Sequence, residues 1–388
     1  MSTPLTLLGG LSAEQFLADY WQKRPLLIRG AFPDFESPLS PDELAGLACE
    51  ENVEARLVEE HGSKGPWQLS HGPFDDDTFS RLGDRDWTLL VQAVDHYVPD
   101  VAELLEHFDF IPSWRLDDIM VSYAPPGGNV GPHVDNYDVF LLQASGQRRW
   151  QVGGLIDEDA PIISGIDLRI LESFEVDAEQ DWVLEPGDML YLPPRIAHHG
   201  VSQSDDCMTF SVGFRAPSAD EIVTSFADYM GEQLSETLRY NDADLKSGDH
   251  AGKLEAAAIE RVRALLLKTL DDRAQLAQWF GRYMTQAKYP DQLVEAEEPV
   301  HADEVEAALK DGIVLERTLG SRFAFHEDEH GVTLFVDGDG VSCEARLARH
   351  LASTAPIDES VLRFLDASVL LAALLTRGSL SWPGDDEE

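Results

Sequence analysis

The chain has 388 residues, which is too long for one small domain and suggests two or three. Aspartate and glutamate total 72 against 29 lysine and arginine, and the net charge of −43 disfavours direct DNA binding, because phosphate contacts need clustered basic side chains. The sequence has no apolar run of membrane-spanning length, no signal peptide and no zinc or disulfide pattern among its three cysteines, so we expect a cytoplasmic protein with no membrane partner.

Residues 1–110 carry both helix and strand signals. Ser12, with Gln15 three residues later, resembles a capping box, so we expect a helix over residues 14–21. Ser40 followed by Pro41 marks a second helix start, since proline is favoured at the first helical position. Residues 87–94 are β-like, so this part of the chain is predicted to be mixed α/β.

Residues 111–216 differ in character, because short β-prone runs alternate with Gly/Pro turns. The expected strands are residues 119–123, 139–143, 150–152, 189–192 and 208–214. Pro125-Pro126-Gly127-Gly128 and Glu185-Pro186-Gly187-Asp188 are strong turn signals between them. Many short strands at close spacing indicate an all-β barrel or a double-sheet jelly roll.

Residues 217–292 switch to helical periodicity. A helix is expected to start at Ser218, and residues 256–270 predict a second one. Its apolar stripe consists of Ile259, Val262, Leu265, Leu266 and Leu270. Acidic residues 295–298 are typical of a linker. Residues 300–388 combine a helix, two strand-like runs and two further helices, an order that resembles a winged helix.

The functional argument starts from Gly131-Pro132-His133-Val134-Asp135. Alternate side chains of a strand share a face, so a strand here would point His133 and Asp135 into the same space. A third ligand is expected from a distant strand, where His198 and His199 are the candidates. Two histidines and one carboxylate form the facial triad of non-haem iron(II) oxygenases, which leaves positions open for a co-substrate and oxygen. The alternative is a barrel-mouth histidine bonded to Asp135 with no metal.

Three further features favour the metal site. A Gly/Pro-rich loop precedes His133, and glycine lets the backbone approach a site closely. A turn and a strand ending in Pro193-Pro194 precede the second histidine position. Arg148 follows His133 at a suitable distance, and a planar guanidinium can bind the far carboxylate of a dicarboxylate co-substrate. Arg148 and Arg149 point to opposite faces of a strand, so only one can line a barrel; two surface arginines are the alternative.

Five segments are distinctive as a set: GPHVDNYDVFLLQASGQRRWQVG, LEPGDMLYLPPRIAHHG, FSVGFRAP, YWQKRPLLIRGAF and SPDELAGLA. They closely resemble the bacterial JmjC-type ribosomal oxygenases over most of residues 1–290 and, more loosely, over the C-terminal unit. The resemblance implies a mainly β catalytic core, a double-stranded β-helix of the cupin/JmjC type with an N-terminal α/β extension, over residues 1–216. It also implies a helical dimerisation region over residues 217–292 and a winged-helix-like α+β domain over residues 300–388.

The resemblance also implies the site residues. The iron(II) ligands it assigns are His133, Asp135 and His198. Arg148 would bind 2-oxoglutarate, and Ser122 and Ser211 would bond the same co-substrate, unless they are ordinary strand hydroxyls. The substrate pocket would consist of Asp118, Met120 and Tyr137. There Asp118 would pair with a guanidinium while the other two clasp its stem, although Tyr137 fits a core residue equally well.

By the same resemblance, the protein is an iron(II)- and 2-oxoglutarate-dependent oxygenase that consumes O2. It would hydroxylate an arginine of the large-subunit ribosomal protein L-sixteen, and it would act as a homodimer. Alternatives of the same class are a ribosomal histidine hydroxylase and another JmjC hydroxylase or demethylase. A metal cupin without oxygenase activity would have no use for Arg148, and a winged-helix binding protein would leave the triad without a role.

The strong negative charge has two compatible explanations. An acidic surface remains soluble at high intracellular salt, where self-repulsion is screened, so the chain has the composition of a halophilic protein. A basic ribosomal protein as substrate would also suit an acidic enzyme. Charge therefore does not choose the substrate.

Overall fold

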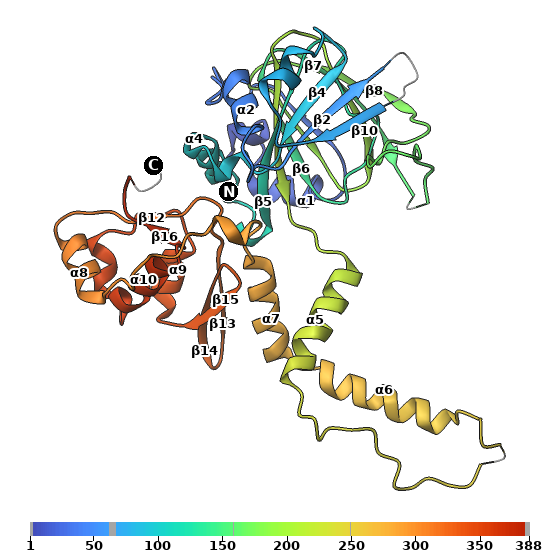
Figure 1. Ribbon diagram of the computed structural model, residues 1–388, viewed down its shortest axis with the longest axis vertical. Coiled ribbons are helices and arrows are strands. Elements are labelled where there is room, and N and C mark those ends of the chain that lie inside the picture. The colour runs from blue at the N-terminus through green and yellow to red at the C-terminus, as the bar shows by residue number, and fades with distance from the viewer. Residues whose placement is uncertain (1–2, 62–66, 158, 249, 385–388) are drawn as a thin grey trace. The chain divides into compact units, whose positions relative to one another are not determined.

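The computed structural model describes residues 3–61, 67–157, 159–248 and 250–384. The chain divides into two compact units, residues 1–216 and 217–388 (Figure 1). In the described ranges, every helix is too short or too polar to span a membrane.

The first unit is built on two antiparallel sheets. The larger one has the strand order β1-β9-β6-β11-β5-β4-β2-β3 and the smaller one β10-β7-β8. The strands of the larger sheet are β1 (Leu26–Ile28), β2 (Ala55–Glu60), β3 (Trp67–His71), β4 (Trp87–Val91), β5 (Leu116–Ala124), β6 (Val139–Ser145), β9 (Met189–Leu192) and β11 (Cys207–Phe214). The strands of the smaller sheet are β7 (Arg148–Leu155), β8 (Val176–Leu184) and β10 (Ile196–Ser202).

Both faces of the larger sheet are buried, and the two faces have different partners. Phe140 and Phe210 face a core shared with the N-terminal helices, including Phe16 of α1. Leu141 belongs instead to a core that includes Trp150 of the smaller sheet. Its strand, β6, lies between β9 and β11 in the larger sheet. The two sheets therefore face each other across an apolar interior, which confirms the predicted double-stranded β-helix.

Short helices cover the outer face. They are α1 (Ala13–Asp19), α2 (Pro41–Leu47), α3 (Asp76–Ser80), α4 (Pro99–Ala102), and the 3-10 turns η1 (Thr6–Leu8), η2 (Val94–His96), η3 (Glu103–Phe108) and η4 (Ser113–Arg115). The capping boxes predicted at Ser12 and Ser40 are both present, with each serine side chain accepting from the third backbone N–H of its helix. Local sequence thus determines where these two helices begin.

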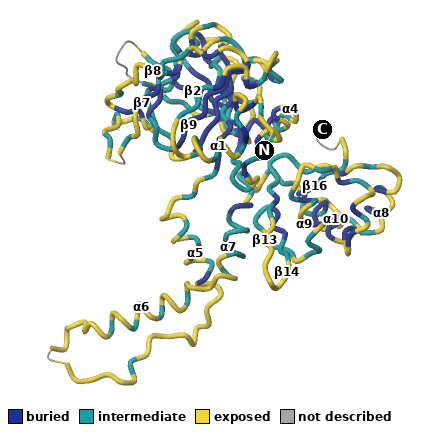
Figure 2. The backbone as a smooth tube through the Cα atoms, turned by 180° about the vertical axis from the view of Figure 1, so that it is seen from behind, coloured by how far each residue is buried: buried dark blue, intermediate teal, exposed yellow. Residues whose placement is uncertain are grey.

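The second unit begins with α5 (Ala219–Gln233), α6 (Ala256–Leu270) and α7 (Arg273–Thr285). Phe226 and Met230 of α5 pack on Trp279 of α7. None of the fifteen residues of α6, all of which the structure describes, is buried within the single chain, and Figure 2 shows the helix as mostly exposed with a few intermediate positions. The predicted apolar stripe is therefore largely uncovered: Leu265 is half-buried and its other four residues are exposed.

The remainder of this unit is a small α+β domain of the predicted order. Its elements are η5 (Pro290–Gln292), α8 (Ala302–Lys310), β12 (Glu316–Arg317), β13 (Phe323–Asp328), β14 (Gly331–Val336), β15 (Asp339–Ser342), α9 (Ala345–Leu351), η6 (Glu359–Arg363), α10 (Ala367–Thr376) and β16 (Leu380–Ser381). Strands β13, β14 and β15 form one sheet, and Leu334 of β14 packs with Val305 of α8 and Leu371 of α10 in a single core. This agrees with the winged-helix order predicted from sequence.

Candidate metal and co-substrate site

Three of the predicted residues come together in space. The ligand atoms of His133, Asp135 and His198 all lie within 4.8 Å of one another. Among the residues that the structure describes, no other group of His, Cys, Asp or Glu gathers closely enough to hold a metal ion. Two imidazoles and one carboxylate are the donor set of non-haem iron(II) sites, so the residues fit such an ion.

The strand predicted through His133 and Asp135 is wrong. His133 forms only an isolated bridge to His198, with reciprocal backbone hydrogen bonds of 3.0 Å, and Asp135 lies outside any strand. The segment leaves strand geometry because Gly131 has φ +78° and Pro132 has no backbone N–H to donate. Gly131 is also needed for space, since a Cβ there would lie 2.7 Å from Ile170. The bridge to His198, rather than strand alternation, brings the ligands together.

Backbone carbonyls fix both histidine rings in the same way. His133 Nδ1 lies 2.9 Å from the Gly131 carbonyl, and His198 Nδ1 lies 2.9 Å from the Ile196 carbonyl. Each Nδ1 can only donate to its carbonyl, so the proton sits there and Nε2 keeps its lone pair. His198 Nε2 lies 3.6 Å from Asp135 Oδ2, which places that lone pair on the side of the carboxylate.

Burial keeps His198 neutral. Its side chain is almost fully buried, and this burial, together with His133 beside it, lowers the pKa of His198 to about 4 despite the opposing Asp135 carboxylate. A neutral imidazole is the form that binds a metal. His198 therefore presents its Nε2 to the cluster without a competing proton at neutral pH.

His199 faces the other way. In the β10–β7 register His198 is opposite Val152 and His199 is opposite Gln151, so the two histidines lie on opposite faces of the strand. His199 Nε2 donates to Asn129 Oδ1 at 3.1 Å, and this contact occupies the nitrogen that would otherwise reach a metal. The structure therefore places His198, and not His199, in the cluster.

The adjacent arginines of β7, Arg148 and Arg149, likewise lie on opposite faces of their strand. Arg148 is only 4% exposed, whereas Arg149 is exposed and pairs with Asp181 through hydrogen bonds of 2.7 and 2.5 Å. Arg148 Nη1 lies 3.4 Å from the Gly200 carbonyl, but its buried Nε and Nη2 have no hydrogen-bond partner in the described chain. A buried guanidinium with two unused donors on one edge fits a bidentate carboxylate ligand.

The two predicted serines lie on the interior face of the larger sheet. Ser211 is opposite Met120 on one side and Leu141 on the other, and Leu141 belongs to the core between the sheets. Ser122 is two residues from Met120 on the same strand, so it shares that face, where it is buried and donates to the Thr209 carbonyl at 3.4 Å. Both hydroxyls therefore point to the side of the barrel that carries Arg148.

The predicted substrate residues lie on and beside β5. Asp118 and Met120 share the interior face with Ser122, and Asp118 is only 3% exposed. Tyr137 is 43% exposed, which does not fit a core residue. The nearby Asp135 carboxylate raises the pKa of the Tyr137 phenol above its ordinary value, so the hydroxyl keeps its proton.

Two residues beside Asp118 were missed by sequence reasoning. Gln92 Nε2 donates to Asp118 Oδ2 at 2.7 Å, and Arg56 Nη2 donates to Gln92 Oε1 at 3.3 Å. Neither residue belongs to a motif. The only signal was strand pairing, which brings the end of β4 beside β5 and which one sequence does not reveal.

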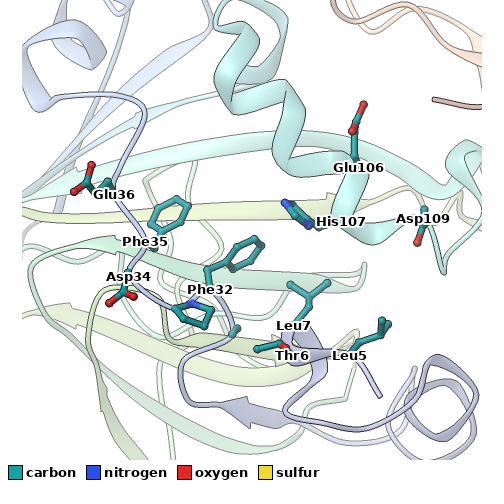
Figure 3. A pocket seen from close by; sticks show the side chains of 12 residues that line it. Leu5, Thr6, Leu7, Phe32, Asp34, Phe35, Glu36, Glu106, His107 and Asp109 are labelled. Carbon is teal, nitrogen blue, oxygen red and sulfur yellow. The ribbon is translucent and has the colours of Figure 1, made fainter. Parts of the chain in front are cut away.

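A separate cavity of about 670 Å³ lies between the N-terminal 3-10 turn and η3. Phe32, Phe35 and His107 line it, with carboxylates at its rim (Figure 3). None of the predicted site residues contributes to this cavity. It is therefore not the place where the candidate chemistry occurs.

Comparison with known families divides the chain in two. Residues 103–222 match the JmjC domain, and residues 268–380 match the ROXA-like winged helix. The ribosomal protein uL16 3-hydroxylase of Escherichia coli (strain K12) is 37% identical over 375 residues, which span 95% of this chain and 97% of that protein. A probable ribosomal oxygenase of Haemophilus influenzae is 33% identical over 366 residues, 91% of this chain and 88% of the relative.

Solved structures agree in fold over nearly the whole chain. An X-ray structure of E. coli ycfD superposes with a TM-score of 0.88 at 36% identity and covers 98% of this chain and 100% of that one. The structure of the E. coli ribosomal oxygenase YcfD in complex with cobalt and 2-oxoglutarate superposes with a TM-score of 0.85, also at 36% identity, and covers 96% and 99% of the two chains. A further complex of YcfD contains cobalt and succinic acid.

Proposed function

This chain belongs to the JmjC-domain ribosomal oxygenases, and we propose that it hydroxylates an arginine side chain of the large-subunit ribosomal protein L-sixteen, written uL16 in the name of its E. coli relative. It is an iron(II)- and 2-oxoglutarate-dependent oxygenase that uses O2. The observation that carries the proposal is that one barrel contains both the His133–Asp135–His198 cluster and the buried guanidinium of Arg148, whose Nε and Nη2 have no partner among the described residues.

In this proposal the cluster holds the iron, and bound iron supplies the redox chemistry that activates oxygen. Both imidazoles turn Nε2 toward the iron because Nδ1 of each ring donates to a backbone carbonyl. Arg148 binds the far carboxylate of 2-oxoglutarate with Nε and Nη2, the two donors for which the described residues offer no partner. Ser122 and Ser211 add hydroxyls from the facing sheet, and the apolar interior excludes water.

The substrate arginine would enter beside β5. Asp118 is a carboxylate on the interior face and would pair with the guanidinium, while Met120 and Tyr137 would contact the aliphatic stem. The protonated Tyr137 hydroxyl adds a donor without adding a second negative charge. A buried carboxylate favours a cationic substrate side chain over a neutral imidazole, and this favours arginine over histidine.

The proposal is tested with the purified enzyme, iron(II), 2-oxoglutarate and peptides of ribosomal protein L-sixteen. Mass spectrometry should find one added oxygen on an arginine, together with stoichiometric succinate. A peptide in which that arginine is replaced by lysine serves as the matched control. Modification of a histidine instead would overturn the substrate assignment while leaving the oxygenase class intact.

We propose that the active form is a homodimer assembled through the helical region. Leu266 and Ile259 of α6 are each 54% exposed in the single chain, and Val262 is 45% exposed. A helix with such a stripe needs a partner surface to bury it, and a second copy related by a two-fold axis is the commonest solution.

We propose that the protein works in the cytoplasm, where its ribosomal substrate is made, and that its acidity serves a salt-rich interior. The acidic residues behind the net charge of −43 are spread along the chain rather than gathered in one segment, which favours a general effect on solubility over contact with one basic partner. Peptide turnover and oligomeric state measured from low to molar potassium chloride test this. Loss of activity as salt rises would contradict salt adaptation.

A further inference from the structure

Arg56, Gln92 and Asp118 form a short chain of contacts on the interior face of the larger sheet. Arg56 Nη2 donates to Gln92 Oε1 at 3.3 Å, and Gln92 Nε2 donates to Asp118 Oδ2 at 2.7 Å. The same Arg56 nitrogen lies 3.8 Å from the Met120 sulfur. The chain therefore ends on two of the three residues of the proposed substrate pocket.

Strand pairing explains why these side chains meet. Arg56 of β2 is opposite Leu90 of β4, and Leu90 is opposite Ser122 of β5, so Arg56 lies on the same face as Ser122. Gln92 lies two residues beyond Leu90, on the same side, and its backbone N–H bonds to the Glu54 carbonyl at 2.9 Å. The sheet thus holds both donors in fixed positions on backbone that is itself hydrogen-bonded.

The direction of each hydrogen bond determines what the chain does. An amide has one accepting end and one donating end, and a flipped Gln92 would turn its oxygen toward the Asp118 carboxylate. The cation of Arg56 can only donate, so it binds the amide oxygen and leaves the amide nitrogen facing Asp118. Arg56 therefore fixes the orientation of Gln92, and Gln92 fixes one oxygen of Asp118.

We propose that Gln92 and Arg56 are positioning residues that hold the Asp118 carboxylate in the geometry needed to bind a substrate guanidinium. This positioning role rests on the proposed function. A planar guanidinium needs both carboxylate oxygens in a defined plane, whereas a lysine ammonium is a point charge that tolerates rotation. The Arg56–Gln92–Asp118 chain of contacts therefore contributes to the selection of arginine over lysine. Gln92 also acts as a spacer that keeps the Arg56 cation one residue away from the carboxylate that the substrate must reach.

The first test uses Gln92→Leu and Arg56→Met, which remove the donors and retain most of the side-chain volume. The KM for an L-sixteen peptide should rise at least about tenfold in Gln92→Leu and less in Arg56→Met, because Gln92 hydrogen-bonds Asp118 directly whereas Arg56 acts through Gln92. The KM for 2-oxoglutarate should stay at the parent value. Turnover of the lysine-substituted peptide relative to the arginine peptide should increase. Gln68→Leu, an exposed glutamine on the neighbouring strand β3, is the matched control and should behave as the parent.

The second test repeats Gln92→Leu in an Asp118→Asn background. Positioning through Asp118 predicts that Gln92→Leu has no further effect there, whereas a general loss of packing would lower activity equally in both backgrounds. Equal losses, or a rise in the KM for 2-oxoglutarate, would overturn the positioning role. If Asp118→Asn raises the peptide KM but Gln92→Leu does not, the positioning role of Gln92 and Arg56 is wrong and the proposed substrate pocket stands. If Asp118→Asn leaves the peptide KM unchanged, the proposed substrate pocket is wrong, and so is the positioning role that depends on it.

Discussion

Replacing Arg148 with methionine should stabilise the ligand-free protein while destroying its response to 2-oxoglutarate. Arg148 is 4% exposed, and although its Nη1 lies 3.4 Å from the Gly200 carbonyl, its Nε and Nη2 have no partner in the described chain, so the desolvation of its charge is only partly offset. Methionine keeps the aliphatic stem and removes the charge. The contact between the guanidinium and the Trp150 ring, 5.9 Å from the ring centroid, is lost, but contacts of this kind contribute only about 1 kcal/mol.

The expected net gain for the ligand-free Arg148→Met protein is about 1 to 3 kcal/mol, the range seen when buried charged groups give way to apolar ones of similar volume. The parent should gain about 2.7 kcal/mol when 2-oxoglutarate is present at a hundred times its dissociation constant, and the variant should gain almost nothing. Manganese(II) replaces iron in this experiment so that no turnover occurs. Calorimetry then measures the stability of the ligand-free proteins and their stabilisation by 2-oxoglutarate, both on the unfolding transition that shifts when the co-substrate is added. Arg149→Met is the matched control, because that side chain is exposed and paired only with Asp181, and it should keep the full ligand response.

Two results would refute this reasoning. If Arg148→Met loses stability in the absence of ligand as a core truncation does, the guanidinium has protein partners that satisfy it. If the variant keeps its stabilisation by 2-oxoglutarate while Arg149→Met loses it, the co-substrate binds on the other face of β7. The second result would also imply a different register between β7 and β10.

Three further predictions concern the metal, the assembly and pH. Alanine at any of the three proposed ligands should abolish iron-supported 2-oxoglutarate turnover, whereas His199→Ala should retain much of it; the reverse pattern in a succinate assay would show that the wrong neighbour was chosen. Leu265→Asp combined with Leu266→Asp should convert the dimer to a monomer in sedimentation experiments, and a monomeric parent in both low and high salt would contradict the dimer. Burial raises the pKa of Asp138 above its ordinary value of 3.8, so the folded chain binds that proton more tightly than the unfolded chain, and the contribution of Asp138 to stability falls as pH rises through the raised pKa. The unfolding free energy of Asp138→Asn relative to the parent should therefore increase from about pH 4 to about pH 7 in urea titrations, and a pH-independent difference would contradict the shift.

Local signals predicted the parts of the fold that depend on nearby residues. The capping boxes at Ser12 and Ser40 formed as expected because each involves only residues within one helical turn. Strand β9 and helix α6 match the predicted ranges because turn residues or a clear helical period mark their ends. Such elements need no information from distant parts of the chain.

The parts that depend on distant partners were not predicted. Strand β8 has mostly exposed residues, three of them acidic, and no clear alternating apolar pattern, and it forms because β7 offers it an edge. The segment from Gly131 to Asp135 was predicted to be a strand on the basis of its His-x-Asp spacing, but a single bridge to His198 sets its shape instead. Arg56 and Gln92 could not be linked to Asp118 because the pairing of β2, β4 and β5 appears only in three dimensions.

Two adjacent doublets, His198–His199 and Arg148–Arg149, show how much depends on one strand register. In the β10–β7 pairing, His198 is opposite Val152 and Ser202 is opposite Arg148, so the buried members of both doublets share the interior face. If the β10–β7 pairing shifted by one residue, the side chains of one strand would change faces. Either His198 or Arg148 would then point away from the barrel interior, which would separate the metal cluster from the co-substrate arginine. Trp150 is opposite Gly200 between them, and a Cβ at residue 200 would lie 2.5 Å from the Trp150 ring, so a residue without a side chain is required where the indole lies. The indole over Gly200 therefore fixes the alignment on which both the metal ligand and the guanidinium depend.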